Sequence, residues 1–201
     1  MQYAGHDLNI TMQNKIKIGE IEILKPRQIV YDILKYKDSG TVLDMGAGFG
    51  RHSLFLAYKG FQVTAVEIED DRLKRLRSQA EKLGVNIHTI QGDVADFVPK
   101  EKYDVILSTM VLHFLTKETA HKALETMQAH TNKDGLNVVS VYTDENPAGI
   151  RPYLFMKNEL GDVYHDWKIL EYEETLGPVI ENPQDGGPDR RYGAKLIARK
   201  K

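Results

Sequence analysis

The segment 41–50, TVLDMGAGFG, places a short apolar run directly before three glycines at alternate positions. The apolar run predicts a buried β-strand. The glycines predict a tight turn that a ligand can approach closely, because glycine has no Cβ. Apolar side chains recur over 54–58, so a helix is expected to start near Gly50 or Arg51. A strand, a glycine turn and a helix in this order are typical of nucleotide-binding units in doubly wound α/β folds.

The spacing of the glycines distinguishes this turn from other nucleotide loops. Dinucleotide folds use G-x-G-x-x-G and P-loops end in Gly-Lys-Ser/Thr, whereas this chain has G-x-G-x-G followed by Arg51. Asp44 precedes the first glycine by two positions, where a carboxylate would repel a phosphate but would suit an ammonium group. The early third glycine disfavours an NAD-linked oxidoreductase. A tight βα turn without a ligand remains the simplest alternative.

The rest of the chain alternates strand and helix patterns. After a first helix at 26–36, strands are expected at 41–45, 62–67, 86–91, 103–108 and 136–142, with helices at 50–59, 70–83 and 117–130 and a turn at 132–135. Two further strands, 168–176 and 192–199, are joined by a loop without a helix, so they must be antiparallel neighbours. The sequence therefore predicts an α/β fold: a doubly wound, mostly parallel, seven-stranded sheet with an antiparallel C-terminal strand pair. Residues 1–25 are expected to form an arm or lid, and 26–201 a single domain.

Composition limits the classes of partner. The chain has 201 residues, 41% hydrophobic and 28% charged, with a formal net charge of −2. The chain has no long basic block, so binding to nucleic acid or to an anionic membrane is not predicted. Cysteine is absent, so disulfides and thiolate metal sites are excluded, and the scattered histidines lack metal-ligand spacing. No signal peptide or membrane-spanning run is evident, so we expect a cytoplasmic protein, monomeric or homodimeric, that acts on a small molecule.

Ligands of open α/β sheets lie beyond the carboxyl ends of the strands, and this rule names candidate residues. Asp44 ends the first strand. Glu67 ends the second, where its two oxygens can accept both hydroxyls of a ribose, although it could instead be a solvated acid or a helix cap. The fourth strand leads into 108–114, which is expected to form the pocket wall. His113 is the titratable group there, either a base or orienting group, or a packed core histidine.

These motifs resemble the S-adenosylmethionine-dependent methyltransferases, and in particular their tellurite-resistance (TehB-type) group. The resemblance covers most of the chain. It rests on the glycine motif at 41–58, on 103–115 (YDVILSTMVLHFL), on 127–139, and on the closing residues 198–201. Phe155, Glu159, Leu160 and Trp167 also match.

The resemblance implies a cofactor, S-adenosylmethionine, and a set of residues around it. Asp44 would lie near its methionine end, with the glycines beneath it. Asp93 would accept from the adenine amino group, although Asp93 could instead cap a helix. Arg27 would approach the cofactor carboxylate. The full expected cofactor set is Arg27, Asp44, Met45, Gly46, Ala47, Gly48, Gly50, Arg51, Glu67, Ile68, Asp93, Val94 and Ser108.

The implied activity is methyl transfer to a small acceptor, such as a tellurium or selenium oxyanion or a thiol-like nucleophile. The family pattern has a His-Arg pair after the sixth strand, but here that region, 177–183, contains neither residue. Arg190 and Arg191 could hold an oxyanion instead, or could be solvated loop charges. His113 and Tyr142 are the candidate bases, and 143–160 the acceptor-side wall or lid. A non-catalytic cofactor sensor or scaffold is the alternative function.

Overall fold

The computed structural model describes residues 15–147, 149–177, 180–181 and 188–201. Its main sheet has seven strands in the order β5-β4-β3-β6-β7-β11-β8. The strands are β3 (Thr41–Met45), β4 (Gln62–Glu67), β5 (Ile87–Gln91), β6 (Tyr103–Thr109), β7 (Thr131–Tyr142), β8 (Lys168–Leu176) and β11 (Tyr192–Arg199). The sheet confirms the predicted doubly wound fold with an antiparallel C-terminal strand pair.

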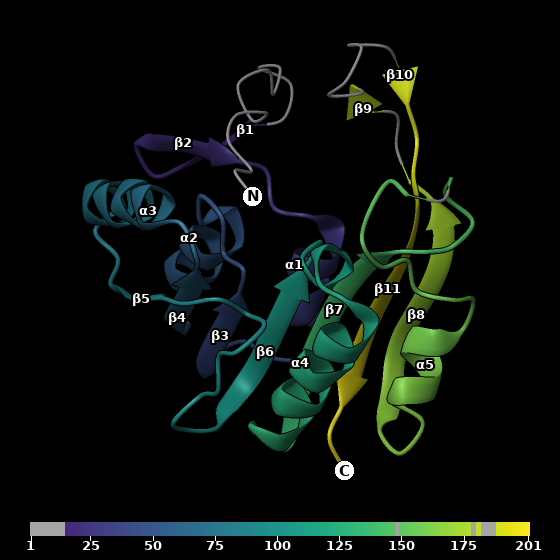
Figure 1. Cartoon of the computed structure of the whole chain (residues 1–201). Coiled ribbons are helices and arrows are strands. Elements are labelled where there is room, and N and C mark those ends of the chain that lie inside the picture. The colour runs from purple at the N-terminus through teal and green to yellow at the C-terminus, as the bar shows by residue number, and fades with distance from the viewer. Residues whose placement is uncertain (1–14, 148, 178–179, 182–187) are drawn as a thin grey trace.

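The strand β11 is the one that runs against the others, between β7 and β8 (Figure 1). Leu196 is opposite Val139 on one side and Tyr172 on the other. The segment between β8 and β11 contains the two-residue strands β9 (Ile180–Glu181) and β10 (Pro188–Asp189). Antiparallel neighbours need no crossover helix, which is why the chain can return directly at this edge.

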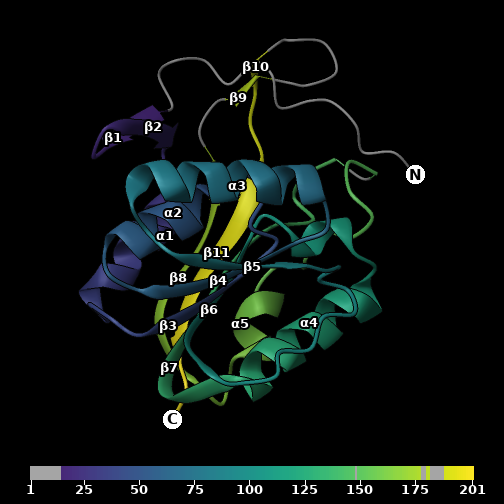
Figure 2. The same cartoon turned by 90° about the vertical axis from the view of Figure 1, so that its left-hand side faces the viewer.

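Helices cover both faces of the sheet (Figure 2). One layer contains α1 (Gln28–Asp32), the 3₁₀ turn η2 (Ile33–Lys35), α2 (Arg51–Tyr58) and α3 (Asp70–Leu83). The other contains η3 (Leu112–Phe114), α4 (Lys117–Ala129) and α5 (Glu159–Val163). Val42 belongs to the first core and Leu43 to the second, so β3 is buried on both faces. Within the described part of the chain, no helix is long and apolar enough to cross a membrane.

Local signals place the start of α4 and the end of α3 where they were expected. Thr116 caps α4 by accepting a hydrogen bond from the Thr119 amide. Gly84 ends α3 with a φ of +69°. The first helix is shorter than the predicted 26–36, because its α-helical part spans only Gln28–Asp32 before the 3₁₀ turn.

The N-terminal segment contains a β-hairpin of β1 (Lys15–Ile18) and β2 (Ile21–Leu24). Ile18 and Ile23 are buried in the core that also includes α2 and α3. Part of the expected arm or lid is therefore packed structure, and apolar side chains at alternate positions were its signal. Residues 1–14 lie outside the described residues, and the boundary at residue 26 stays a prediction.

The prediction of a turn at 132–135 before a strand at 136–142 was wrong about where β7 begins. Thr131 already pairs with Tyr103, and a register shift separates this pair from the regular pairing that resumes at Leu136. Asp134, within the shifted stretch, has a φ of +61°. The turn signal at Gly135 therefore marks an irregularity inside the strand rather than its start.

A buried hydrogen-bond chain links β7 to the segment after α5. The Tyr164 hydroxyl donates to Asn137 Oδ1 at 2.9 Å, and Asn137 Nδ2 donates to Thr131 Oγ1 at 2.6 Å. Tyr164→Phe would leave a buried amide oxygen unsatisfied, so we expect unfolding free energy to fall by about 1–3 kcal/mol in urea titrations. Tyr58, which is 47% exposed, supplies the control Tyr58→Phe. Equal losses in both variants would contradict a role for this chain of bonds.

Candidate functional site

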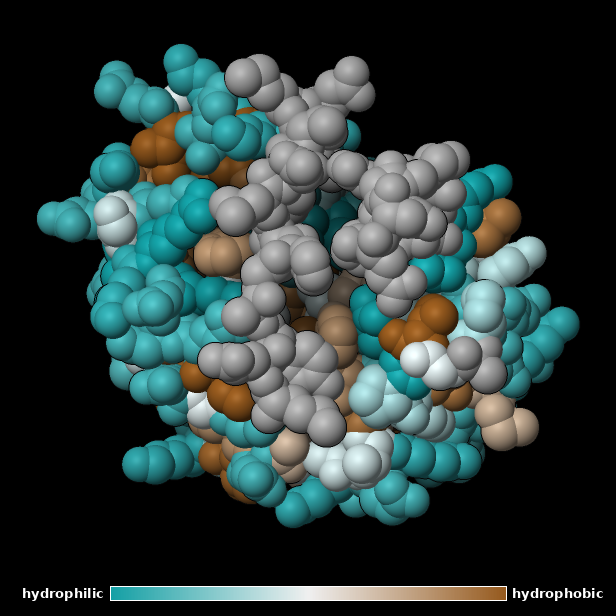
Figure 3. All heavy atoms as spheres, turned by 45° about the horizontal axis from the view of Figure 1, so that its top comes forward, coloured by the Kyte–Doolittle hydropathy of each residue, from teal (hydrophilic) through white to brown (hydrophobic). Residues whose placement is uncertain are grey.

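A cavity of about 410 Å³ opens at the carboxyl ends of the parallel strands. Figure 3 shows this face of the molecule, with apolar atoms visible inside a hollow. The glycine turn, the end of β4, the segment after β5 and the segment after β6 line the cavity. The predicted cofactor residues that line it are Gly46, Ala47, Gly48, Arg51, Glu67, Ile68, Asp93 and Val94. The cavity therefore lies where ligands of open α/β sheets are expected, beyond the carboxyl ends of the strands.

The glycine turn brings backbone close to the cavity. Gly46 and Gly48 have φ values of +83° and +57°. The amides of Gly46 and Ala47 both donate to Val66 O at 2.9 Å, which ties the turn to β4. A Cβ on Gly46 would overlap the side chain of Val111. Only glycine fits at this position, because both the backbone angle and the space exclude a side chain.

Glu67 lies at the end of β4 and is 5% exposed. Its Oε2 accepts from the Gly48 amide at 2.8 Å, and its Oε1 accepts from the Glu69 amide at 3.2 Å. These bonds fix the carboxylate between the turn and the start of α3. Because a carboxylate oxygen has two acceptor positions, each oxygen can accept a further hydrogen bond from a ligand diol in the cavity.

Asp44 lies beneath the glycine turn and does not line the cavity wall. It is 1% exposed, its Oδ2 accepts from Ser53 Oγ at 2.6 Å, and its buried Oδ1 has no hydrogen-bond partner. Burial raises the pKa of Asp44 to about 6, and the negative charge of Glu67 adds to the rise while Ser53 opposes it. An unsatisfied buried carboxylate oxygen fits a cationic donor, such as an ammonium group.

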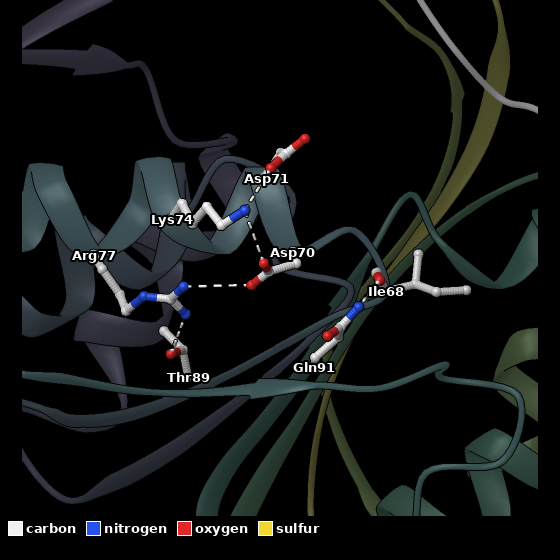
Figure 4. A network of polar contacts seen from close by, with 7 residues as sticks. All are labelled: Ile68, Asp70, Asp71, Lys74, Arg77, Thr89 and Gln91. Carbon is white, nitrogen blue, oxygen red and sulfur yellow. Dashed lines mark hydrogen bonds and ion pairs between the residues drawn. The ribbon is translucent and has the colours of Figure 1, made fainter.

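The walls after β4 and β5 combine apolar side chains with a carboxylate. Ile68 lines the cavity although it is 55% exposed, and its carbonyl accepts from Gln91 Nε2 at 3.2 Å (Figure 4). Val94 is buried, and the adjacent Asp93 accepts from the Ala95 amide at 2.9 Å through Oδ1. Two apolar surfaces beside a carboxylate suit a flat ring that carries an amino group.

Polar contacts along the start of α3 hold this wall in place. Arg77 bridges Asp70 at 3.4 Å and Thr89 of β5 at 3.0 Å, and Lys74 contacts both Asp70 and Asp71 (Figure 4). The two acidic residues also occupy the first turn of α3, where negative charge is favourable. The network joins α3 to β5 next to the cavity.

The segment after β6 forms a further wall of the cavity, in the region 108–114 where the sequence predicted one. Met110, a non-glycine residue, has a φ of +61°, and such backbone strain is found at binding sites. Thr109 Oγ1 lies 2.9 Å from His52 Nδ1. His52 is 4% exposed, and burial together with the nearby charges of Arg51 and Arg27 holds its pKa well below the usual range.

Sequence reasoning missed several lining residues, which are Leu24, Phe49, His52, Glu69, Arg72 and Leu115. The position of His52, in the first turn of the helix after the glycines, was a signal that it would face the ligand. Leu24 had no such signal, because only the folded hairpin brings it to the cavity. In the described residues, no three His, Asp or Glu side chains gather as a metal site.

His113 lies just outside the cavity wall and is 1% exposed. Its Nδ1 accepts from the Tyr142 amide at 3.2 Å, and its ring stacks on the Tyr142 ring with centroids 4.4 Å apart. Burial, followed by the charges of Arg151 and Arg27, lowers the pKa of His113 to about 3. A neutral imidazole with Nδ1 occupied carries its proton on Nε2, so His113 is a hydrogen-bond donor rather than a strong base.

Several predicted residues do not form the cavity wall. Arg190 is exposed and donates through Nε to Gly177 O at 2.9 Å, and the Arg191 carbonyl accepts from the Gly177 amide. Arg27 precedes α1, and its amide lies 3.5 Å from His52 Nε2. The predicted residues outside the wall are Arg27, Asp44, Met45, Gly50, Ser108, His113, Tyr142, Arg190 and Arg191.

Three of these residues have a clear structural place. Met45 is a core residue. Gly50 has a φ of +80° directly before α2, and a Cβ there would overlap Leu76. Ser108 is fully buried in β6, and its Oγ has no hydrogen-bond partner.

Comparison with known proteins identifies relatives of this fold and site. Residues 14–190 match the family model described as tellurite resistance protein TehB. A probable S-adenosyl-L-methionine-dependent methyltransferase TehB of Haemophilus influenzae strain 10810 is 35% identical over 175 residues, which are 86% of this chain and 61% of that protein. This chain therefore spans about three fifths of the length of the curated relative.

Solved structures agree with this relationship. The crystal structure of TehB from Haemophilus influenzae superposes with a TM-score of 0.82 at 33% identity, covering 88% of this chain and 63% of that one. A Burkholderia thailandensis 1,6-didemethyltoxoflavin-N1-methyltransferase with bound S-adenosylhomocysteine has a TM-score of 0.68 at 20% identity, covering 87% and 77%. The second likeness supports the fold alone.

The raised pKa of Asp44 predicts how stability depends on pH. Because the folded-state pKa lies above the unfolded value, the folded protein binds more protons between about pH 4 and pH 6, and stability falls as pH rises through this range. We expect Asp44→Asn to remove this fall. The unfolding free energy of the variant minus that of wild type should therefore rise by about 2–3 kcal/mol from pH 4 to pH 7. Urea titrations at several pH values measure it.

The matched control is Asp96→Asn, because Asp96 is an exposed carboxylate outside the cavity wall. A wild-type profile that Asp44→Asn leaves unchanged would show that Asp44 is ionised at no cost in the folded protein.

Proposed function

This chain belongs to the tellurite resistance protein TehB family, and we propose that it transfers a methyl group from S-adenosylmethionine to a small-molecule acceptor. The arrangement of Asp44 and Glu67 around the glycine turn is the observation that carries this proposal. One carboxylate has a buried oxygen without a donor, and the other faces the cavity. This pair suits a ligand with an ammonium group and a ribose diol, and it repels a diphosphate.

In this proposal each end of the cofactor meets a different wall. Glu67 accepts from the ribose hydroxyls, while Ile68, Val94 and Asp93 accommodate the adenine. Asp44, beneath the turn, attracts the ammonium group of the methionine end. Arg51 and Arg27, whose charges act together on His52, are placed to attract the carboxylate.

Methyl transfer requires little of the protein beyond aligning the acceptor with the methyl group. The bound sulfonium supplies an activated methyl group and its own leaving group. The protein has to hold a nucleophile about 3–3.5 Å from the methyl carbon and exclude water. A soft anion needs no base, whereas a phenol or an amine needs one. The low pKa of His113 makes it a weak base, so its Nε2 proton serves to orient an acceptor, and Tyr142 remains the other candidate base.

We infer that the acceptor is a soft nucleophile, either a tellurium or selenium oxyanion or a thiol-like group. The family to which the chain belongs supports the oxyanion, and the weak basicity of His113 supports any nucleophile that is already anionic. Arg190 and Arg191 remain candidate oxyanion contacts from the loop before β11.

Binding of S-adenosylmethionine by calorimetric titration tests the role of Asp44. We expect Asp44→Ala to remove most of the binding, because the ammonium group loses its carboxylate partner. Wild-type affinity should also fall as pH drops below about 6, where Asp44 becomes protonated. Asp96→Ala is the control and should bind like wild type. Equal affinity of Asp44→Ala and wild type would contradict the proposed position of the methionine end.

Formation of S-adenosylhomocysteine tests catalysis itself. We expect turnover with at least one member of a panel of selenite, tellurite, small thiols and phenols, and the thiols and oxyanions should react without a requirement for a base. A protein that binds S-adenosylmethionine but turns over none of these acceptors would instead be a sensor or scaffold. The missing His-Arg pair in 177–183 makes this alternative worth the measurement.

A further inference from the structure

Arg151 lies on the segment between β7 and α5 and is not itself one of the residues that line the cavity. Its guanidinium carbon is 4.7 Å from the centroid of the Phe114 ring and 5.6 Å from that of Tyr142. Phe114 lines the cavity, and the rings of Phe114 and Tyr142 both pack on His113. Arg151 is therefore fixed over the aromatic surface that adjoins the cofactor cavity.

The guanidinium of Arg151 has unused hydrogen-bonding capacity. Its Nη1 donates to the neighbouring carbonyl of Ile150, and its Nε is buried without a partner. In the ranges that the structure describes, no carboxylate forms an ion pair with it. Since a guanidinium has five N–H donors, most of its donors are available to a ligand, and an anion would satisfy them best.

The segment that follows Arg151 is held by hydrogen bonds. The Tyr153 amide donates to His113 O at 3.4 Å, and the Phe155 amide donates to Tyr142 O at 3.0 Å. Glu159 at the start of α5 accepts from Tyr153 OH and lies 2.9 Å from His121 Nε2 of α4. These bonds attach residues 153–159 to η3, β7 and α4, which anchors the chain directly after Arg151.

The aromatic surface beside the cavity carries positive charge. The charges of Arg151 and Arg27 both act on His113, to which Phe114 and Tyr142 are packed. The cavity wall itself has both signs of charge, from Glu67 and Asp93 and from Arg51. A negatively charged acceptor would be attracted to the surface around His113.

We propose that Arg151 forms an anion subsite at the mouth of the cavity and selects acceptors that carry negative charge. The inference rests on the proposed methyl transfer and deepens it. For a thiol acceptor, its proton passes to solvent, the thiolate sulfur bonds to the methyl carbon, and the C–S bond of the sulfonium breaks with its electron pair left on the departing sulfur. Arg151 holds the anionic group of the acceptor during this step.

Two thiols of similar size and opposite charge, mercaptoacetate and cysteamine, test the proposal. Each is titrated calorimetrically into protein saturated with S-adenosylhomocysteine. We expect wild type to bind mercaptoacetate at least tenfold more tightly than cysteamine. Arg151→Gln should lose about tenfold in mercaptoacetate affinity, and Arg151→Lys should retain part of it. Lys157→Gln, an exposed cation on the same segment, is the control and should match wild type.

The outcomes separate this inference from the proposed function. S-adenosylhomocysteine should bind all four proteins equally, and its failure to bind wild type would contradict the proposed function. In that case the thiols titrated alone still report on Arg151. No charge preference in wild type, or the same loss in Lys157→Gln as in Arg151→Gln, would overturn the anion subsite. A parallel titration with selenite shows whether the subsite holds an oxyanion as well as a carboxylate.

Discussion

The hydrogen bond from the Gly48 amide to Glu67 joins the ends of two neighbouring strands at the point where the ligand cavity opens. Together with the Gly46 and Ala47 amides on Val66 O, it fixes the glycine turn against β4. The glycine turn also positions α2. In that position Ser53 donates a hydrogen bond to Asp44, and His52 lies within hydrogen-bond distance of Thr109. The rest of the site depends on this connection, because each wall of the cavity is set relative to the glycine turn.

Much of the fold could be predicted because its signals are local. The boundaries of β3, β4, α3, β8 and β11 follow from apolar runs, helical spacing and glycine stops that lie within each segment. The cavity at the strand ends was predictable for the same reason. Glu67 is the last residue of β4, Asp93 comes two residues after β5, and the parallel sheet brings these strand ends to one edge.

The acceptor side was less predictable because it is built by contacts between distant segments. Arg151 meets Phe114 across 37 positions of the chain, and no spacing in the sequence connects them. The β1–β2 hairpin adds Leu24 to the cavity only after Ile18 and Ile23 are buried under the helices. His113 was identified as a candidate, but its neutral state and occupied Nδ1 depend on Tyr142 and on burial, which the sequence does not reveal.

The proposed role of Asp44 in ligand binding would come at a cost in stability. An apolar residue could fill its place below the glycine turn, yet the chain has a carboxylate there with one oxygen unsatisfied. Burial opposes its ionisation, and the ionised form is the one that attracts an ammonium group. In the proposed complex, the ammonium group of the ligand would offset this cost by bringing a positive charge near the carboxylate. The same reasoning applies with opposite sign to the proposed role of Arg151, whose Nε is buried without an acceptor.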